Sequence, residues 1–168
     1  MCDTGYSVKR LVEDLRELKA RGEPEPVMLE EVRELVKRLM LMKHNWLRGS
    51  MRVPSADPSS PGVYRLHEEP DHSLSVFVHT WAPGEETRPH NHGTWAVIGG
   101  LEGWETQHRW KLLDDGSVVR DRSERVDERT IVALDSQAIH SVHNDSGAVS
   151  VTLHVYGVDP EYTGRRSF

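Results

Sequence analysis

The sequence is almost without cysteine, and this scarcity limits both the fold and the compartment. Cys2 is the single cysteine among 168 residues, so no intrachain disulfide can form and nothing favours an oxidising compartment. A long apolar run is also missing: no stretch of about 18 apolar residues occurs, and charged residues alternate with leucine near the N-terminus. We therefore expect a cytoplasmic protein with no membrane span and no secretion signal.

An excess of positive charge is missing as well. The chain has 21 Lys and Arg against 27 Asp and Glu, which gives a formal net charge of -6 and a pI near 5.9. Such a chain repels nucleic acid and anionic membranes unless it carries a local basic patch. The pair Arg165 and Arg166 is too short to form one, so we expect neither partner. The length is that of one ordinary domain, residues 1–168.

The first part of the chain has the pattern of two helices. Apolar residues at spacings of three and four predict one helix over residues 7–20 and another over 30–47. The glycine- and proline-containing stretch 22–26 separates them, because proline does not continue a helix interior. We expect a helical hairpin within residues 1–48 that packs on the rest of the protein. A dimer contact is the alternative role, so we expect a monomer or a weak homodimer.

The remainder of the chain is predicted to be mostly β. Residues 49–62 are rich in Ser, Pro and Gly and are expected to form a linker loop. Short runs of β-branched and aromatic residues then follow, over 63–66, 74–81, 95–98, 105–113, 117–119, 130–133, 140–142 and 149–156. Residues 114–116 have the sequence of a hairpin turn, and the charged run 120–129 is expected to be a solvated loop and strand edge. This spacing predicts an antiparallel sandwich or barrel with a C-terminal tail over residues 63–168.

Three histidines are candidate metal ligands. His90 and His92 are two positions apart, so in an extended segment both imidazoles project to the same side. His140 lies on another predicted strand and has Asn144 four residues later. His143 competes with it, because alternation puts only one of the two on the inner face. We prefer His140 and expect a divalent transition metal on His90, His92 and His140.

The spacing of these histidines resembles the two characteristic motifs of the cupin superfamily. Gly84 opens the pattern G-x5-H-x-H, a later H-x3-N follows, and the resemblance covers about residues 62–157. It implies a single cupin barrel, also called a double-stranded β-helix or jelly roll. Cupins normally place a glutamate ligand where this chain has Ala96. A site of three neutral histidines leaves open positions for a substrate and oxygen.

Among cupins, the replacement of that glutamate is typical of the thiol dioxygenases. Those enzymes also carry Ser-x-His-x-Tyr near the end of the barrel, and this chain has Thr152, His154 and Tyr156 in the same place. Alternation puts the three side chains on one face, so a hydrogen-bonded relay from hydroxyl through imidazole to phenol is allowed. The resemblance implies Fe(II) as cofactor and a catalytic role for these three residues.

The likeness is greater to the bacterial branch that oxidises 3-mercaptopropionate. That branch has H-x-H-x-x-W, then H-V-Y-G, then a pair of arginines, and here Trp95, Gly157 and the pair Arg165 and Arg166 complete these patterns. Trp95 is therefore a candidate pocket residue.

A substrate carboxylate needs a cation near the metal, because a buried unpaired carboxylate is costly. Arg65 and Arg166 are the candidates, and Arg165 is the alternative to Arg166. Arg65 lies in the strand where cysteine dioxygenases place a carboxylate-binding arginine. A shift of one or two residues in the register would place Val63 or Tyr64 there instead.

The leading functional prediction is therefore an Fe(II) thiol dioxygenase whose partners are a small mercapto-acid and O2. One alternative is a non-catalytic metal-binding cupin, which is favoured by Asp135 and Gln137, where the second cupin motif usually has Pro and Gly. The other is a cupin oxygenase or isomerase that acts on a non-thiol acid. Nickel, zinc or manganese are further candidates for the metal in a purified sample.

Overall fold

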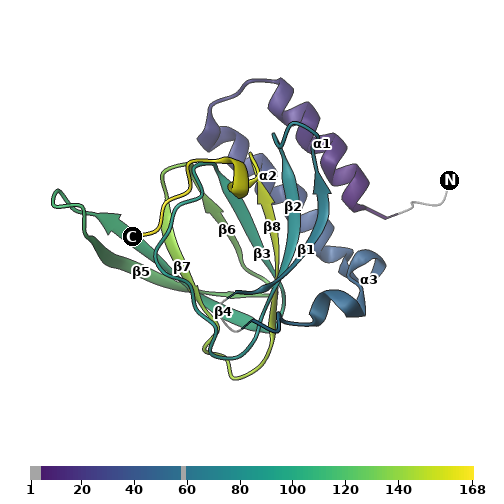
Figure 1. The fold of residues 1–168 in the computed structure, drawn as a ribbon. Helices are drawn as coiled ribbons and strands as arrows, with labels where there is room; N and C mark the ends of the chain where they lie inside the picture. Colours follow the sequence, from purple (N-terminus) through teal and green to yellow (C-terminus); the bar gives the residue numbers. More distant parts are fainter. Residues whose placement is uncertain (1–4, 58–59) are drawn as a thin grey trace.

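Two antiparallel β-sheets face each other, and helices cover the outer face of the larger sheet (Figure 1). The computed structural model describes residues 5–57 and 60–168. Cys2 lies outside the described residues. The predicted mostly β sandwich with N-terminal helices is confirmed.

The α-helices all precede the strands. They are α1 (Val8–Ala20), α2 (Glu25–Leu41) and α3 (Lys43–Trp46), and two 3-10 turns are η1 (Gly49–Arg52) and, near the C-terminus, η2 (Pro160–Tyr162). The strands are β1 (Gly62–Glu68), β2 (Ser75–Trp81), β3 (Ala96–Glu102), β4 (Trp104–Leu112), β5 (Val118–Asp127), β6 (Ile131–Leu134), β7 (Ile139–His143) and β8 (Ser150–Tyr156).

Strand β8 is the centre of the larger sheet, whose order is β1-β2-β8-β3-β6. It pairs with β2 on one side and with β3 on the other, and all seven of its residues are buried. Val151, Leu153 and Val155 belong to the core beneath the helices, whereas Tyr156 belongs to a second core between the two sheets. The smaller sheet, β5-β4-β7, closes the other side of this interior.

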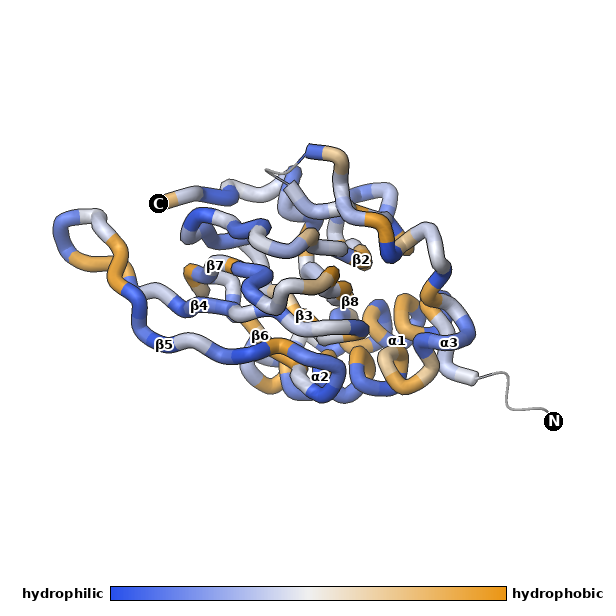
Figure 2. Tube along the Cα trace, turned by 90° about the horizontal axis from the view of Figure 1, so that it is seen from below, coloured by the Kyte–Doolittle hydropathy of each residue, from blue (hydrophilic) through white to orange (hydrophobic). Residues whose placement is uncertain are grey.

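The helices use the apolar residues that the sequence pattern identified. In α1, the Ser7 hydroxyl accepts a hydrogen bond from the Arg10 amide, and Leu11, Leu15 and Leu18 are buried against the larger sheet. Hydrophobic and hydrophilic residues alternate along α1 and α2 (Figure 2). Among the described residues, no helix is long and apolar enough to cross a membrane.

The predicted start of the second helix was wrong. The helix α2 begins at Glu25, not near residue 30, and Pro26 lies inside its first turn. Proline is tolerated there because the first amides of a helix have no partner within it, and its fixed φ suits a helix. At the other end, α2 stops at Leu41 and the short α3 follows.

Two further segments are more regular than predicted. The charged run over 120–129 is mostly the strand β5, which pairs only with β4 and lies at the edge of the smaller sheet. Charged residues suit an edge strand, since they discourage pairing with other chains. The predicted linker contains η1. The hairpin turn over 114–116 is confirmed, with Gly116 at φ +83 and the Leu113 amide donating to the Ser117 carbonyl at 2.8 Å.

Candidate metal centre

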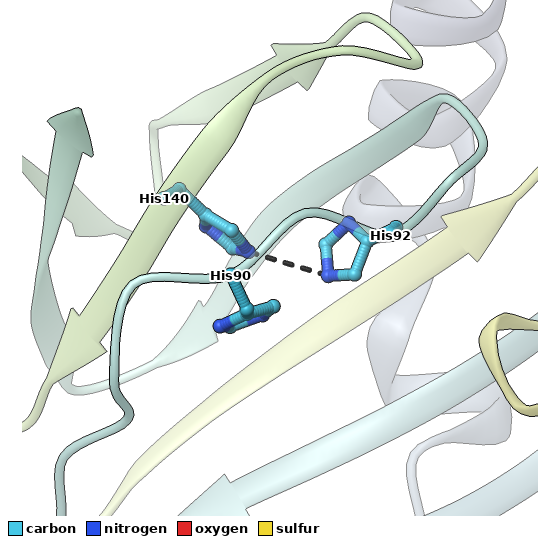
Figure 3. A group of neighbouring side chains, drawn as sticks. All are labelled: His90, His92 and His140. Atoms are coloured by element: carbon cyan, nitrogen blue, oxygen red, sulfur yellow. Dashed lines mark hydrogen bonds between the residues drawn. The ribbon is translucent and has the colours of Figure 1, made fainter. Parts of the chain in front are cut away.

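Three histidine side chains converge between the two sheets (Figure 3). His140 lies on β7, and His90 lies in the segment between β2 and β3 that pairs with it through two backbone hydrogen bonds of 2.8 and 2.9 Å. His92 follows two residues later. The candidate ligand atoms of the three lie within 4.8 Å of one another. The sequence therefore identified three residues that the fold brings together from separate segments.

Hydrogen bonds at Nδ1 place the lone pair of two of these rings on Nε2, the atom that would bind a metal. The Nδ1 of His90 is 2.9 Å from the Arg88 carbonyl oxygen, which can only accept, so Nδ1 carries the proton. The Nδ1 of His140 is 3.1 Å from Oε1 of Gln107. Histidines that bind metals usually donate their other ring N–H to such an acceptor.

The spacing of one pair of donors fits a shared metal ion. The Nε2 atoms of His92 and His140 are 3.3 Å apart. Two nitrogens that are each about 2.1 Å from one metal lie about 3.0 to 3.4 Å apart at tetrahedral or octahedral angles. Ala96, where cupins carry a glutamate, is fully buried and pairs with Tyr156 and Leu134 across the sheet. Its methyl group offers no ligand, so the donor set is three histidines.

Burial keeps these imidazoles neutral, which a metal ligand requires. Burial is the largest cause in each case. It lowers the pKa of His90 to about 4, and it lowers the pKa values of His92 and His140 well below the ordinary value. The positive charge of Arg165 adds to the effect on His90 and His92. The lone pairs are thus available at neutral pH.

Acidification from pH 7 to pH 5 is expected to destabilise the metal-free protein. In this window the unfolded chain protonates His79 and His90 near pH 6.5, whereas the folded chain protonates them only near pH 3 and pH 4, so stability falls as pH falls. Each contributes a loss of about 2 kcal/mol by pH 5. Three more buried histidines act in the same direction.

Glu105 acts in the opposite direction but is outweighed. Burial raises its pKa to about 7, so the folded state holds the extra proton below that pH and gains stability on acidification. The stability gained from this one carboxyl group offsets the stability lost from about one histidine. Urea or thermal unfolding in a chelator at pH 7, 6 and 5 measures the net effect, and a stability that stays constant would contradict it.

The predicted relay beside the histidines is present. On the inner face of β8, Thr152 Oγ1 is 3.0 Å from Nε2 of His154, and Nδ1 of His154 is 2.9 Å from the Tyr156 hydroxyl. The Tyr156 ring lies edge-on to His92 with ring centroids 5.0 Å apart. Burial raises the pKa of Tyr156, which keeps its phenol protonated. A phenol proton is therefore held next to the candidate metal ligands.

A cavity of about 290 Å³ opens onto these groups. It is lined by the three histidines, His154 and Tyr156, and also by Ser60, Pro61, Val63, His79, Trp81, Thr87, Val142 and Arg165. This volume suits a small molecule of a few carbon atoms. The space is lined by polar and apolar groups together, as in small-molecule sites.

Among the predicted arginines, the structure places Arg165 at the cavity and the other two elsewhere. Arg65 is half-exposed, pairs with Glu68 at 2.7 Å and does not line the cavity. Its strand neighbour Val63 lines the cavity instead, which is one of the predicted register alternatives. The side chain of Arg166 lies over the Phe168 ring, at 5.3 Å from its centroid.

The tail that carries Arg165 is tied to the segment that carries two of the histidines. The Asn91 amide donates to the Arg166 carbonyl at 3.0 Å, and the Arg166 amide donates to Oδ1 of Asn91 at 2.9 Å. The Thr163 hydroxyl donates to the His92 carbonyl. These bonds fix the backbone on both sides of Arg165 relative to the candidate metal ligands.

Trp95 is not in the predicted pocket. Its ring belongs to the core between the larger sheet and the helices, on the opposite side of β3 from the cavity. The reason is strand alternation: Ala96 faces the interior, so its neighbour faces away. His143, the competitor of His140, is half-buried and does not line the cavity, as alternation predicted.

Three polar residues of this region, two fully buried and one half-buried, were missed by the sequence analysis. Glu105 and Gln107 connect to His140 through hydrogen bonds, and the ring of His79 stacks on His154 with centroids 3.9 Å apart. The i, i+2 spacing of Glu105 and Gln107 was visible in the sequence, but their proximity to His140 depends on the pairing of β4 with β7. His79 lies on a strand that is buried on both faces, so alternation gave no sign of which side is inner.

Comparisons with known proteins show the fold. No protein-family model matches the chain. An oxalate oxidase solved with the substrate analogue glycolate is similar with a TM-score of 0.52 and 15% identity, over 67% of this chain and 57% of that one. An uncharacterized protein with a double-stranded β-helix domain from Klebsiella pneumoniae subsp. pneumoniae MGH 78578 is similar with a TM-score of 0.53 and 15% identity, over 70% and 86%.

The DMSP lyase DddQ from Ruegeria pomeroyi DSS-3 is similar with a TM-score of 0.51 and 16% identity, over 69% of this chain and 55% of that chain. The chain thus spans little more than half of the oxalate oxidase and lyase chains. The fold is a cupin-like jelly roll, as the sequence motifs predicted. Enzymes occur among these neighbours.

Proposed function

We propose that this protein is an Fe(II)-dependent thiol dioxygenase, which adds both atoms of O2 to the sulfur of a small mercapto-acid and gives a sulfinate. The substrate is 3-mercaptopropionate or cysteine. The observation that carries the proposal is the hydrogen-bonded chain from Thr152 through His154 to Tyr156, beside three buried histidines. Neither metal storage nor isomerisation requires a phenol held in this way.

The donor set suits this chemistry. His90, His92 and His140 would hold the iron through neutral nitrogens, and Ala96 adds no carboxylate. Bound Fe(II) would supply a cationic centre with open positions for a thiolate and O2. Because the protein contributes no negative charge to that centre, an anionic sulfur ligand is favoured.

The hydrogen bonds of the relay can run in two directions, and only one of them leaves the Tyr156 hydroxyl free to donate into the cavity. If the Thr152 hydroxyl donates to Nε2 of His154, then Nδ1–H of His154 donates to the Tyr156 oxygen, and the phenol proton remains free to point into the cavity. In the opposite direction the phenol donates its hydrogen bond to Nδ1 of His154, and no proton is left to point into the cavity. The first arrangement lets Tyr156 donate a hydrogen bond to the reacting molecules while His154 fixes its orientation.

Arg165 is the group that would bind the substrate carboxylate. It lines the cavity, and among the described residues it makes no ion pair that would occupy its charge. Its positive charge also reaches Tyr156 and opposes the effect of burial on the pKa of that phenol. A mercapto-acid would therefore lie between the histidines, at its sulfur end, and Arg165, at its carboxylate end.

Oxygen uptake tests the proposal. The protein is loaded anaerobically with Fe(II), mixed with 3-mercaptopropionate, cysteine or cysteamine in separate experiments, and exposed to oxygen. We expect one O2 to be consumed per thiol with at least one mercapto-acid, and mass spectrometry to find a product two oxygen atoms heavier than the thiol.

Propionate serves as the thiol-free control, and His140→Ala protein treated in the same way serves as the control for free iron. No thiol-dependent uptake with any of the three thiols would rule the proposal out. Uptake with the thiol-free acid would favour a cupin oxygenase of another kind.

A further inference from the structure

Glu105 is a fully buried carboxyl group that makes no ion pair within the described residues. Its Oε1 accepts a hydrogen bond from Nε2 of Gln107 at 3.2 Å, and its Oε2 accepts one from the Ser150 hydroxyl at 3.2 Å. A buried acid without a cation is costly to a fold. The two hydrogen bonds that Glu105 accepts are therefore the contacts through which this carboxyl can have a role.

Gln107 passes the effect of Glu105 to a candidate metal ligand. This residue is also fully buried, and its Oε1 is 3.1 Å from Nδ1 of His140. A side-chain amide has an acceptor end and a donor end. Because the carboxyl oxygen of Glu105 takes the N–H, the carbonyl end of Gln107 is left to face His140. The ring must then carry its proton on Nδ1, which leaves the lone pair on Nε2.

The comparison with His90 shows why His140 needs such a chain. The Nδ1 of His90 faces the backbone carbonyl of Arg88, which cannot present a donor. The partner of His140 is an amide that exchanges its two ends when it rotates by half a turn. A rotated Gln107 would donate to Nδ1 and force the proton onto Nε2, the atom that faces His92.

We propose that Glu105 and Gln107 are positioning residues that fix the tautomer of His140 and thereby set the metal affinity of the three-histidine centre. The inference rests on the metal site of the proposed function but not on the oxidation of a thiol. Neither residue contacts the cavity, so both act only through His140.

The first test is the tautomer itself. Nitrogen-15 chemical shifts of the histidine rings in metal-free protein distinguish Nδ1–H from Nε2–H. In the wild type we expect His140 to carry its proton on Nδ1. In Gln107→Leu and Glu105→Leu we expect a mixture of tautomers or the Nε2–H form. Glu105→Gln keeps an acceptor for Gln107 and offers the Ser150 hydroxyl an N–H donor in place of the carboxyl acceptor, so it should preserve the wild-type signal.

The second test is the affinity for Zn(II) and Co(II), measured by competition with a chelator. Loss of a group that orients a metal ligand typically weakens metal binding 10- to 100-fold. We expect a weakening of about this size in Gln107→Leu and Glu105→Leu, and little change in Glu105→Gln or Gln107→Glu. Thr80→Val is the matched control: it removes a buried hydrogen bond, 2.6 Å to the Met51 carbonyl, on the helix-facing side of β2.

Two results would overturn the inference. One is an Nε2–H tautomer of His140 in the wild type. The other is a Glu105→Leu or Gln107→Leu protein with unchanged tautomer and unchanged metal affinity. If Glu105→Leu does not fold, Gln107→Leu against Gln107→Glu gives the same comparison. Because the tautomer needs neither metal nor thiol, a failure of oxygen uptake would remove the proposed function and leave this result standing.

Discussion

Replacing His140 with alanine is expected to weaken iron binding by at least about 100-fold, because loss of a ligand costs more than loss of a group that merely orients one. His140 supplies one of three neutral donors and lies buried between the sheets. With two imidazoles left and no carboxylate among the described residues that line the cavity, the ion would be held weakly. Iron content after anaerobic loading and desalting, together with chelator competition, measures the change.

His143→Ala is the matched control for this experiment. It removes an imidazole from the same strand, β7, but from a half-buried position outside the cavity, and its iron content should equal that of the wild type. Unfolding curves of both metal-free variants separate metal loss from general destabilisation. Full iron retention by His140→Ala would mean that the ligands have been identified wrongly.

Replacing Arg165 with glutamine is expected to raise KM for a mercapto-acid about 10- to 100-fold. A hydrogen bond to a charged group contributes about 1.5 to 3 kcal/mol, and each 1.4 kcal/mol corresponds to about a factor of ten. Arg165 is largely exposed, so the lower part of that range is expected. The measurement is the rate of oxygen uptake against substrate concentration for the wild type and the variant.

Two controls make the Arg165 experiment specific. Arg166→Gln removes the same charge from the next residue, whose side chain lies over Phe168, and should leave KM nearly unchanged. Cysteamine has a thiol but no carboxylate, so any turnover of it should respond little to Arg165→Gln. An equal rise in KM for cysteamine and for the mercapto-acid in Arg165→Gln would contradict carboxylate binding by Arg165.

Local spacing was sufficient to predict the parts of the site that lie on one strand or one short segment. His90 and His92 are two residues apart, and so are Thr152, His154 and Tyr156, so the extended backbone alone puts each group on one face. The antiparallel sandwich or barrel was predictable for the same reason, because its strands show alternation and are separated by turn residues, whereas the jelly roll was implied by the resemblance to cupins. These are features that depend on neighbours along the chain.

The parts that were missed or left open depend on contacts between distant segments. Gln107 meets His140 only because β4 pairs with β7, and Arg165 reaches the cavity only because the tail pairs with the segment around Asn91. Trp95 was misplaced because one residue of register decides between the interior and the outside. Arg65 shares a face with Val63 but lies two residues further along β1, where it pairs with Glu68 instead of lining the cavity. The start of α2 was missed because proline was treated as a stop, although the first turn of a helix accepts it.

The hydrogen bonds between Asn91 and Arg166 have a consequence for selectivity by chain length. They join the backbone beside His90 and His92 to the backbone beside Arg165, so the separation of the two ends of the cavity is set by a short, directly bonded connection. A homologous series of ω-mercapto-carboxylic acids should therefore show a sharp optimum at one number of methylene groups. Shorter members would fail to span the two ends, and longer ones would have to bend within the cavity.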